Sequence, residues 1–212
     1  VSRTLWSPAG VTLQILLGLA GLISLVLPGA RLDWAARPMD LVELMAVVIV
    51  VWSTFAVHEL AHAGALIRCG GLPRRFGIML FYLMPAAYCD VTDAWLLPRR
   101  SRALVLLSGI LSQFALAGAF LLWGAAGGPA QFTTVVALML LLTCAVNLVP
   151  FVKLDGYLLV AALTETPFLH RRSTEAFTTD VAAVLGGRRP STEARWVRVF
   201  GIFTSLAPIV IT

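Results

Sequence analysis

The stretch Leu41–Ile67, LVELMAVVIVVWSTFAVHELAHAGALI, decides the fold class. It is long and apolar enough for a helix that crosses a bilayer, which needs about 20 residues. The rest of the chain agrees, since 59% of its 212 residues are hydrophobic and only 13% are charged. A soluble domain carries about a quarter charged residues. The composition therefore predicts an α-helical polytopic membrane protein.

Four further apolar runs predict the other spans of a single membrane domain over residues 1–212. With the first stretch they make about five transmembrane helices. The run nearest the N-terminus follows Arg3 and could be read as a signal peptide. Because it is longer than a usual signal core, we expect a retained helix. The four runs are Val11–Leu27, Ala103–Gly124, Phe132–Val152 and Trp196–Thr212.

Arginine accounts for nearly all of the net charge of +5. It is concentrated in the segments 68–102 and 165–195, whereas 124–131 contains no basic residue. Because positively charged loops stay in the cytoplasm, we expect a cytoplasmic N-terminus and alternating spans. No basic helix or aromatic-interleaved patch favours nucleic-acid binding. We therefore expect the protein to contact a lipid bilayer and not to bind nucleic acid.

Two segments between the runs have their own patterns. The segment 68–102 holds the short aromatic stretches Phe76–Leu83 and Ala86–Val91, which predict a membrane-associated β-hairpin on the cytoplasmic side. A helical re-entrant segment is the alternative. The segment 165–195 is the only extended polar stretch, and it predicts a cytoplasmic loop with at most a short helix.

The second run contains the motif HExxH, formed by His58, Glu59 and His62. Positions four apart share one helix face, so both imidazoles can meet one ion. Zinc suits imidazole nitrogen, and Glu59 can take a proton from water at the metal and deliver it to a leaving amine. Such groups are costly inside an apolar span unless they are paired or bound to something. A packing network between helices is the alternative.

A catalytic zinc site needs a third protein ligand. A third histidine is not found six residues after His62, where Arg68 stands, and His170 lies in the polar segment, where we expect it to be solvated. Asp155 is the best candidate, because the arginine topology puts it at the membrane depth of the motif. Two other carboxylates follow the hairpin, and we expect capping or substrate contact from them rather than metal binding: Asp90 and Asp93.

The residues around Asp155 are consistent with a site. Pro150 would interrupt the helix and free backbone groups, and Gly156 would let the chain turn closely past the metal. Asn147 lies two turns before Asp155 on an apolar helix. Its amide could bind a substrate backbone or a developing oxyanion, or make a hydrogen bond between helices. We expect no disulfide or cysteine zinc site, because no CxxC pair occurs among Cys69, Cys89 and Cys144.

Together these elements resemble the site-2 protease family of intramembrane zinc metalloproteases. The HExxH motif, Asn147-Leu-Val-Pro150 and Leu154-Asp155-Gly156 match that family in order and spacing, over roughly residues 41–163. The resemblance implies a three-helix catalytic core with a membrane-associated β element. It also implies that His58, His62 and Asp155 are the zinc ligands. Glu59 would be the base, and Asn147 would contact the substrate or the oxyanion.

A narrower resemblance concerns Tyr82–Trp95 and Asn147–Tyr157, which look like the bacterial peptide zinc metalloprotease branch. It implies a bacterial inner membrane and leader removal in ribosomal peptide biosynthesis of the daptide type. The expected activity is hydrolysis of a peptide bond, near the cytoplasmic face, in a membrane-associated or precursor peptide. The alternative is a non-catalytic zinc-binding scaffold or transporter subunit, although a pure binding site needs no base at Glu59.

Overall fold

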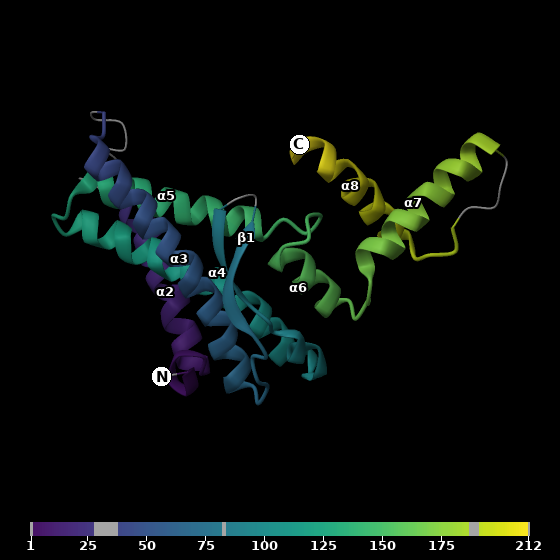
Figure 1. Cartoon of the computed structure of the whole chain (residues 1–212), viewed down its shortest axis with the longest axis horizontal. Coiled ribbons are helices and arrows are strands. Elements are labelled where there is room, and N and C mark those ends of the chain that lie inside the picture. The colour runs from purple at the N-terminus through teal and green to yellow at the C-terminus, as the bar shows by residue number, and fades with distance from the viewer. Residues whose placement is uncertain (1, 28–37, 82–83, 187–190, 212) are drawn as a thin grey trace. The chain divides into compact units, whose positions relative to one another are not determined.

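The computed structural model describes residues 2–27, 38–81, 84–186 and 191–211. It divides into two compact units, Val1–Val146 and Asn147–Thr212. Most of the described residues are helical (Figure 1). Within these ranges three helices are long and apolar enough to cross a membrane, namely α3 (Leu41–Arg68), α4 (Arg99–Ala125) and α5 (Ala130–Asn147).

These three helices coincide with the second, third and fourth predicted spans. The first predicted span forms the shorter apolar helix α2 (Pro8–Ser24), which follows a single turn, α1 (Ser2–Leu5). The last forms α8 (Arg195–Ile211). The structure therefore agrees with a helical membrane protein, and five spans remain a prediction.

The helix starts follow local capping chemistry. At the start of α3 the Asp40 carboxylate accepts from the Glu43 backbone N–H at 2.8 Å, and the Glu43 carboxylate accepts from the Asp40 N–H at 3.1 Å. This reciprocal pair satisfies two backbone donors that a helix leaves unbonded. At the start of α2 the Ser7 hydroxyl accepts from the Gly10 N–H, and Pro8 stands at the first helical position.

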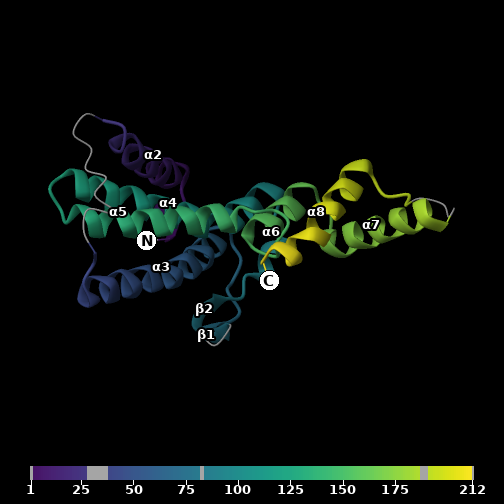
Figure 2. The same ribbon diagram turned by 90° about the horizontal axis from the view of Figure 1, so that it is seen from above.

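Helices α4 and α5 run between α2 and α3 in the first unit (Figure 2). The α2–α4 crossing is close because it is made of glycines. A Cβ on Gly21 would lie 2.3 Å from the Gly118 Cα, and a Cβ on Gly118 would lie 2.6 Å from the Gly18 Cα. Small residues let helix backbones approach within a membrane, where packing replaces the hydrophobic driving force.

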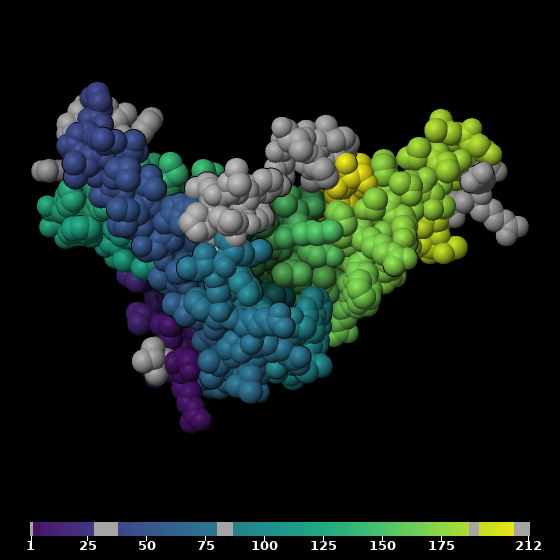
Figure 3. Space-filling view, viewed as in Figure 1, coloured from purple at the N-terminus to yellow at the C-terminus, as the bar shows by residue number. Residues whose placement is uncertain are grey.

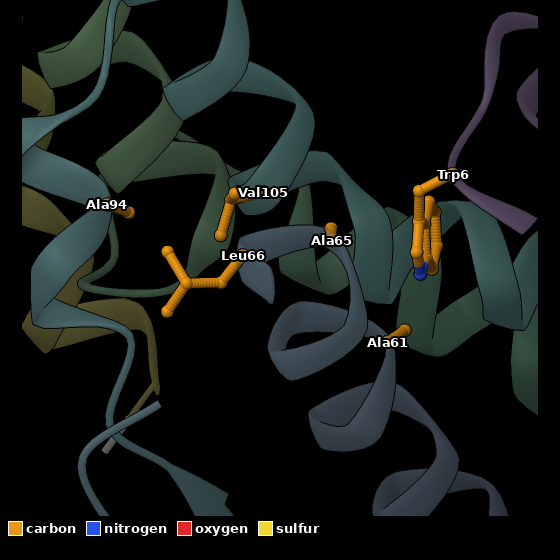
Figure 4. Packing of buried hydrophobic residues seen from close by; sticks show 6 residues of the cluster. All are labelled: Trp6, Ala61, Ala65, Leu66, Ala94 and Val105. Atoms are coloured by element: carbon orange, nitrogen blue, oxygen red, sulfur yellow. The ribbon is translucent and has the colours of Figure 1, made fainter. Parts of the chain in front are cut away.

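Two apolar clusters hold α3 against its neighbours. One joins Ala65 and Leu66 of α3 to Val105 of α4, with Trp6 and Ala94 beside them (Figure 4). The other joins α3 and α5 to the far half of α4, through Val47, Ala117, Leu121, Val136, Ala137 and Leu140.

Much of the remaining surface of α3 is apolar and exposed. In its first turns Leu41, Val42, Leu44, Met45 and Ile49 are exposed. Figure 3 shows the N-terminal part of α3, in dark blue, on the surface of the molecule. An exposed apolar face on a helix of this length is typical of a lipid contact.

The predicted hairpin is present. Strands β1 (Phe76–Phe81) and β2 (Met84–Cys89) pair antiparallel, with Phe76 opposite Cys89. Tyr82 and Leu83, predicted as the end of the first strand, lie outside the described residues. Strand β2 packs against α3, and the 3₁₀ turn η1 (Thr92–Leu96) leads into α4.

The second unit contains α6 (Asp155–Leu163), α7 (Leu169–Gly186) and α8. The prediction of a loop with at most a short helix over 165–195 is wrong, because α7 occupies 18 of those residues. Its polar face is neutralised by partners distant in sequence: Arg172 pairs with Glu193 and Asp180 with Arg198, both at part-buried positions. The core of this unit is formed by Tyr157, Ala161, Leu169, Val197 and Phe200.

Candidate metal centre

The two histidines of the motif lie on the inward face of α3. His58 is 6% exposed and His62 is 4% exposed, whereas Val57 and Leu60 beside them are 41% and 56% exposed. The helical period of the motif thus turns both imidazoles away from the outer surface and toward α4. Their Nε2 atoms lie 3.0 Å apart, so the structure brings the two predicted histidine ligands together.

Each imidazole is oriented by a partner on its other nitrogen. The Nδ1 of His62 lies 2.7 Å from the Val105 backbone oxygen, and the Nδ1 of His58 lies 3.1 Å from Oε1 of Gln113. A carbonyl oxygen can only accept, so each Nδ1 carries a hydrogen, and Nε2 is the nitrogen of each ring that a metal ion could take. Two Nε2 atoms 3.0 Å apart are close enough to bind one ion together.

The space in front of the two Nε2 atoms is kept open by Gly109 of α4. A Cβ at this position would lie 2.5 Å from the Nε2 of His58 and 2.6 Å from the Nε2 of His62. Any side chain here would collide with both Nε2 atoms, so only glycine leaves room beside them. The residues present thus fit an ion that binds imidazole nitrogen, in both donor chemistry and available space.

Glu59 points to the hairpin. Its carboxylate is half-buried and accepts from the backbone N–H of Cys89, at the end of β2, at 2.9 Å. Burial, together with the nearby charges of Glu59 and Asp90, raises the pKa of the Cys89 thiol to about 11. The thiol therefore stays protonated at neutral pH.

The two carboxylates after the hairpin have other partners. Asp90 accepts from the backbone N–H and hydroxyl of Thr92, and these bonds lower the pKa of its carboxyl group. Asp93 accepts from the Arg74 guanidinium at 2.7 Å. Asp90 thus caps a turn and Asp93 forms an ion pair, as expected for residues outside a metal site.

Asp155 and Asn147 both belong to the second unit. The interruption expected near Pro150 is present, because α5 ends at Asn147 and Asp155 opens the separate helix α6, so the two residues do not lie two turns apart on one continuous helix. Gly156 allows the intervening chain to fold back tightly, since a Cβ there would lie 2.5 Å from the Leu148 carbonyl oxygen. His58, His62 and Asp155 offer two imidazole nitrogens and a carboxylate oxygen, a donor set that could hold a metal ion.

His170 is half-buried rather than solvated as predicted. It lies at the start of α7, where its backbone N–H donates to the Tyr157 hydroxyl at 3.0 Å. Burial, and then the charge of Lys153, lowers the pKa of its imidazole. Its surroundings are those of a packed helix start.

Comparison with known proteins returned no match: no family model, curated protein or solved structure is similar to this chain. The chemistry of the site is therefore what indicates the function.

Sequence reasoning missed the residues of α4 that surround the histidines. Gln113 is fully buried in an otherwise apolar run, and an amide in such a run is itself a signal of a functional or pairing role. Gly109 has no comparable signal, because glycines are common in membrane helices.

Proposed function

We propose that this protein is an intramembrane zinc metalloendopeptidase of the site-2 protease type. The observation that carries the proposal is the pair of Nε2 atoms that lie 3.0 Å apart beside Gly109, on a helix apolar enough to cross a membrane. The Nδ1 of each ring is engaged by an oxygen of α4, which orients both Nε2 atoms toward the same place.

In this proposal His58, His62 and Asp155 hold the ion and leave one position open, as catalytic zinc sites do. When bound, zinc supplies a Lewis acid that makes water acidic near neutral pH and polarises a carbonyl group. Glu59 stands next to the ligand face, takes the proton from water and passes it to the leaving amine. A metal site without catalysis would need no carboxylate in this position.

The substrate is an extended peptide segment near the cytoplasmic face of a bacterial inner membrane. Extension matters because a helical backbone has its carbonyl groups engaged in hydrogen bonds. The β-hairpin supports this part of the proposal, since the last residue of β2 bonds to Glu59 and a two-stranded sheet has free edges to which a strand can add. Asn147 would contact the substrate backbone or oxyanion. Leader removal from a ribosomal precursor peptide is the task we propose.

The test compares the wild type with Glu59→Gln in membrane vesicles that contain candidate precursor peptides. We expect the wild type to cleave a precursor and the variant to be slower by about 10²–10⁴-fold, the usual contribution of a general base. Both should bind zinc equally, because Glu59 is not a ligand. Equal cleavage by the two, or zinc binding with no cleavage by either, would favour the scaffold alternative.

A further inference from the structure

The polar contacts of the two histidines come from one stripe of α4. Val105, Gly109 and Gln113 are spaced four residues apart and so share a helix face. Val105 contacts His62, Gly109 stands before both Nε2 atoms, and Gln113 contacts His58. Since His58 precedes His62 whereas Gln113 follows Val105, the two helices run antiparallel across the site.

The two histidines are oriented by different kinds of group. His62 bonds to a backbone carbonyl, which no substitution of a side chain removes. The Ser108 hydroxyl lies 3.2 Å from the same Nδ1 but donates to the Val105 oxygen. His58 bonds to the side chain of Gln113. The contact from α4 that places the hydrogen of His58 on Nδ1 is therefore made by a side chain, which a substitution can remove.

Gln113 is not placed for stability alone. Its side chain is fully buried, and its Nε2 has no hydrogen-bond partner in the described part of the chain. A buried unpaired N–H costs about 1–3 kcal/mol, and a leucine would fill the position without that cost. The hydrogen bond to His58 is therefore the contact that explains a glutamine at this position.

We infer that Gln113 is a positioning residue of the zinc site, which holds His58 with its hydrogen on Nδ1 and its lone pair on Nε2. The inference rests on the proposed metal site. Loss of such an outer partner of a histidine ligand typically weakens metal binding about 10–100-fold.

The experiment measures zinc affinity of the full-length chain in detergent or nanodiscs, by competition with a chromophoric chelator. Gln113→Leu should weaken binding about 10–100-fold. Gln113→Glu keeps an acceptor oxygen at the same reach and should retain wild-type affinity. Ser112→Ala is the matched control, because Ser112 is also buried but its hydroxyl donates to the Gly109 carbonyl on its own helix. It should bind zinc as the wild type does.

Two further readings separate positioning from packing. Gln113→Leu removes the buried unpaired N–H of Gln113 together with the bond to His58, so the unfolding temperature of the zinc-free protein should change little. Imidazole ¹⁵N spectra should show His58 as the Nδ1–H tautomer in the wild type and as a mixture in Gln113→Leu. A purely structural role predicts the reverse, with lowered stability and an unchanged tautomer.

The outcomes distinguish this inference from the function on which it rests. A wild type that binds no zinc would overturn both. A wild type that binds zinc with the same affinity as Gln113→Leu would overturn only the inference. Gln113→Glu binding as weakly as Gln113→Leu would also overturn it, because the acceptor oxygen would then not matter.

Discussion

The α3–α4 pair and the α7–α8 pair bury polar groups in opposite ways. Between α7 and α8 the charged groups pair with each other, as Arg198 does with Asp180 at 2.6 Å. Between α3 and α4 the two imidazoles place their Nε2 atoms 3.0 Å apart beside a glycine, and each Nδ1 faces an oxygen of α4. Ion pairs between helices hold a fold together, whereas imidazole nitrogens brought to one place can bind a metal ion.

The largest effect should come from removing a ligand of the α3–α4 site. We expect His62→Ala to lose measurable zinc binding, because two ligands from protein are too few for a catalytic zinc site. The variant should still insert and fold, since the α2–α4 and α3–α4 contacts outside the site are unchanged. Zinc content by atomic spectroscopy and circular dichroism check the two statements. Full zinc occupancy in His62→Ala would mean that the ion binds at a site that does not include His62.

The next effect concerns the space that Gly109 leaves beside the Nε2 atoms of His58 and His62. We expect Gly109→Ala to weaken zinc binding strongly and to destabilise the fold by about 1–3 kcal/mol, the usual effect of overpacking. The matched control lies in the other region: a Cβ at Gly186 in α7 meets nothing within 4 Å. Gly186→Ala should leave zinc binding unchanged and add up to about 1 kcal/mol of stability. Equal zinc affinity in the two variants would mean that Gly109 does not shape the site.

The smallest effect concerns acid pH and the α7–α8 pair. Hydrogen bonds from Arg198 and Arg172 lower the pKa values of Asp180 and Glu193 below their ordinary values of 3.8 and 4.5. A lowered folded-state pKa gives stability that is present above the unfolded-state pKa and is lost as the pH falls through the folded-state one. We therefore expect this pair of helices to become less protected as the pH falls below about 4.

Hydrogen exchange of α7 and α8 measured between neutral and acid pH checks this expectation. The change should be modest, because exposed ion pairs contribute little and are screened by salt. Asp180→Asn should flatten part of the pH dependence. An identical pH dependence in that variant would exclude the Asp180–Arg198 pair as its source.

The sequence predicted the elements that depend on local pattern. The span Leu41–Ile67 is α3 to within one residue, and the β-hairpin lies where its aromatic stretches indicated. The prediction of a loop over 165–195 was wrong because the charges of this segment indicated contact with solvent. Arg172 and Asp180 instead pair with residues at least 18 positions away. Pro150 indicated a break in the fourth span, and α5 ends at Asn147, before the apolar run ends at Val152, because hydropathy does not mark where a chain leaves the helix.

For the candidate site, the sequence by itself determined the ligand face of α3. Spacing by four places His58 and His62 together on any α-helix, and flanking apolar residues turn that face inward. Only the tertiary structure decided what meets it. The contacts of Val105 and Gln113 join residues 43 and 55 positions apart, and they exist because α4 crosses α3 at Gly109. Helical periodicity shows which face is buried, but the residues that meet across a helix crossing follow from packing.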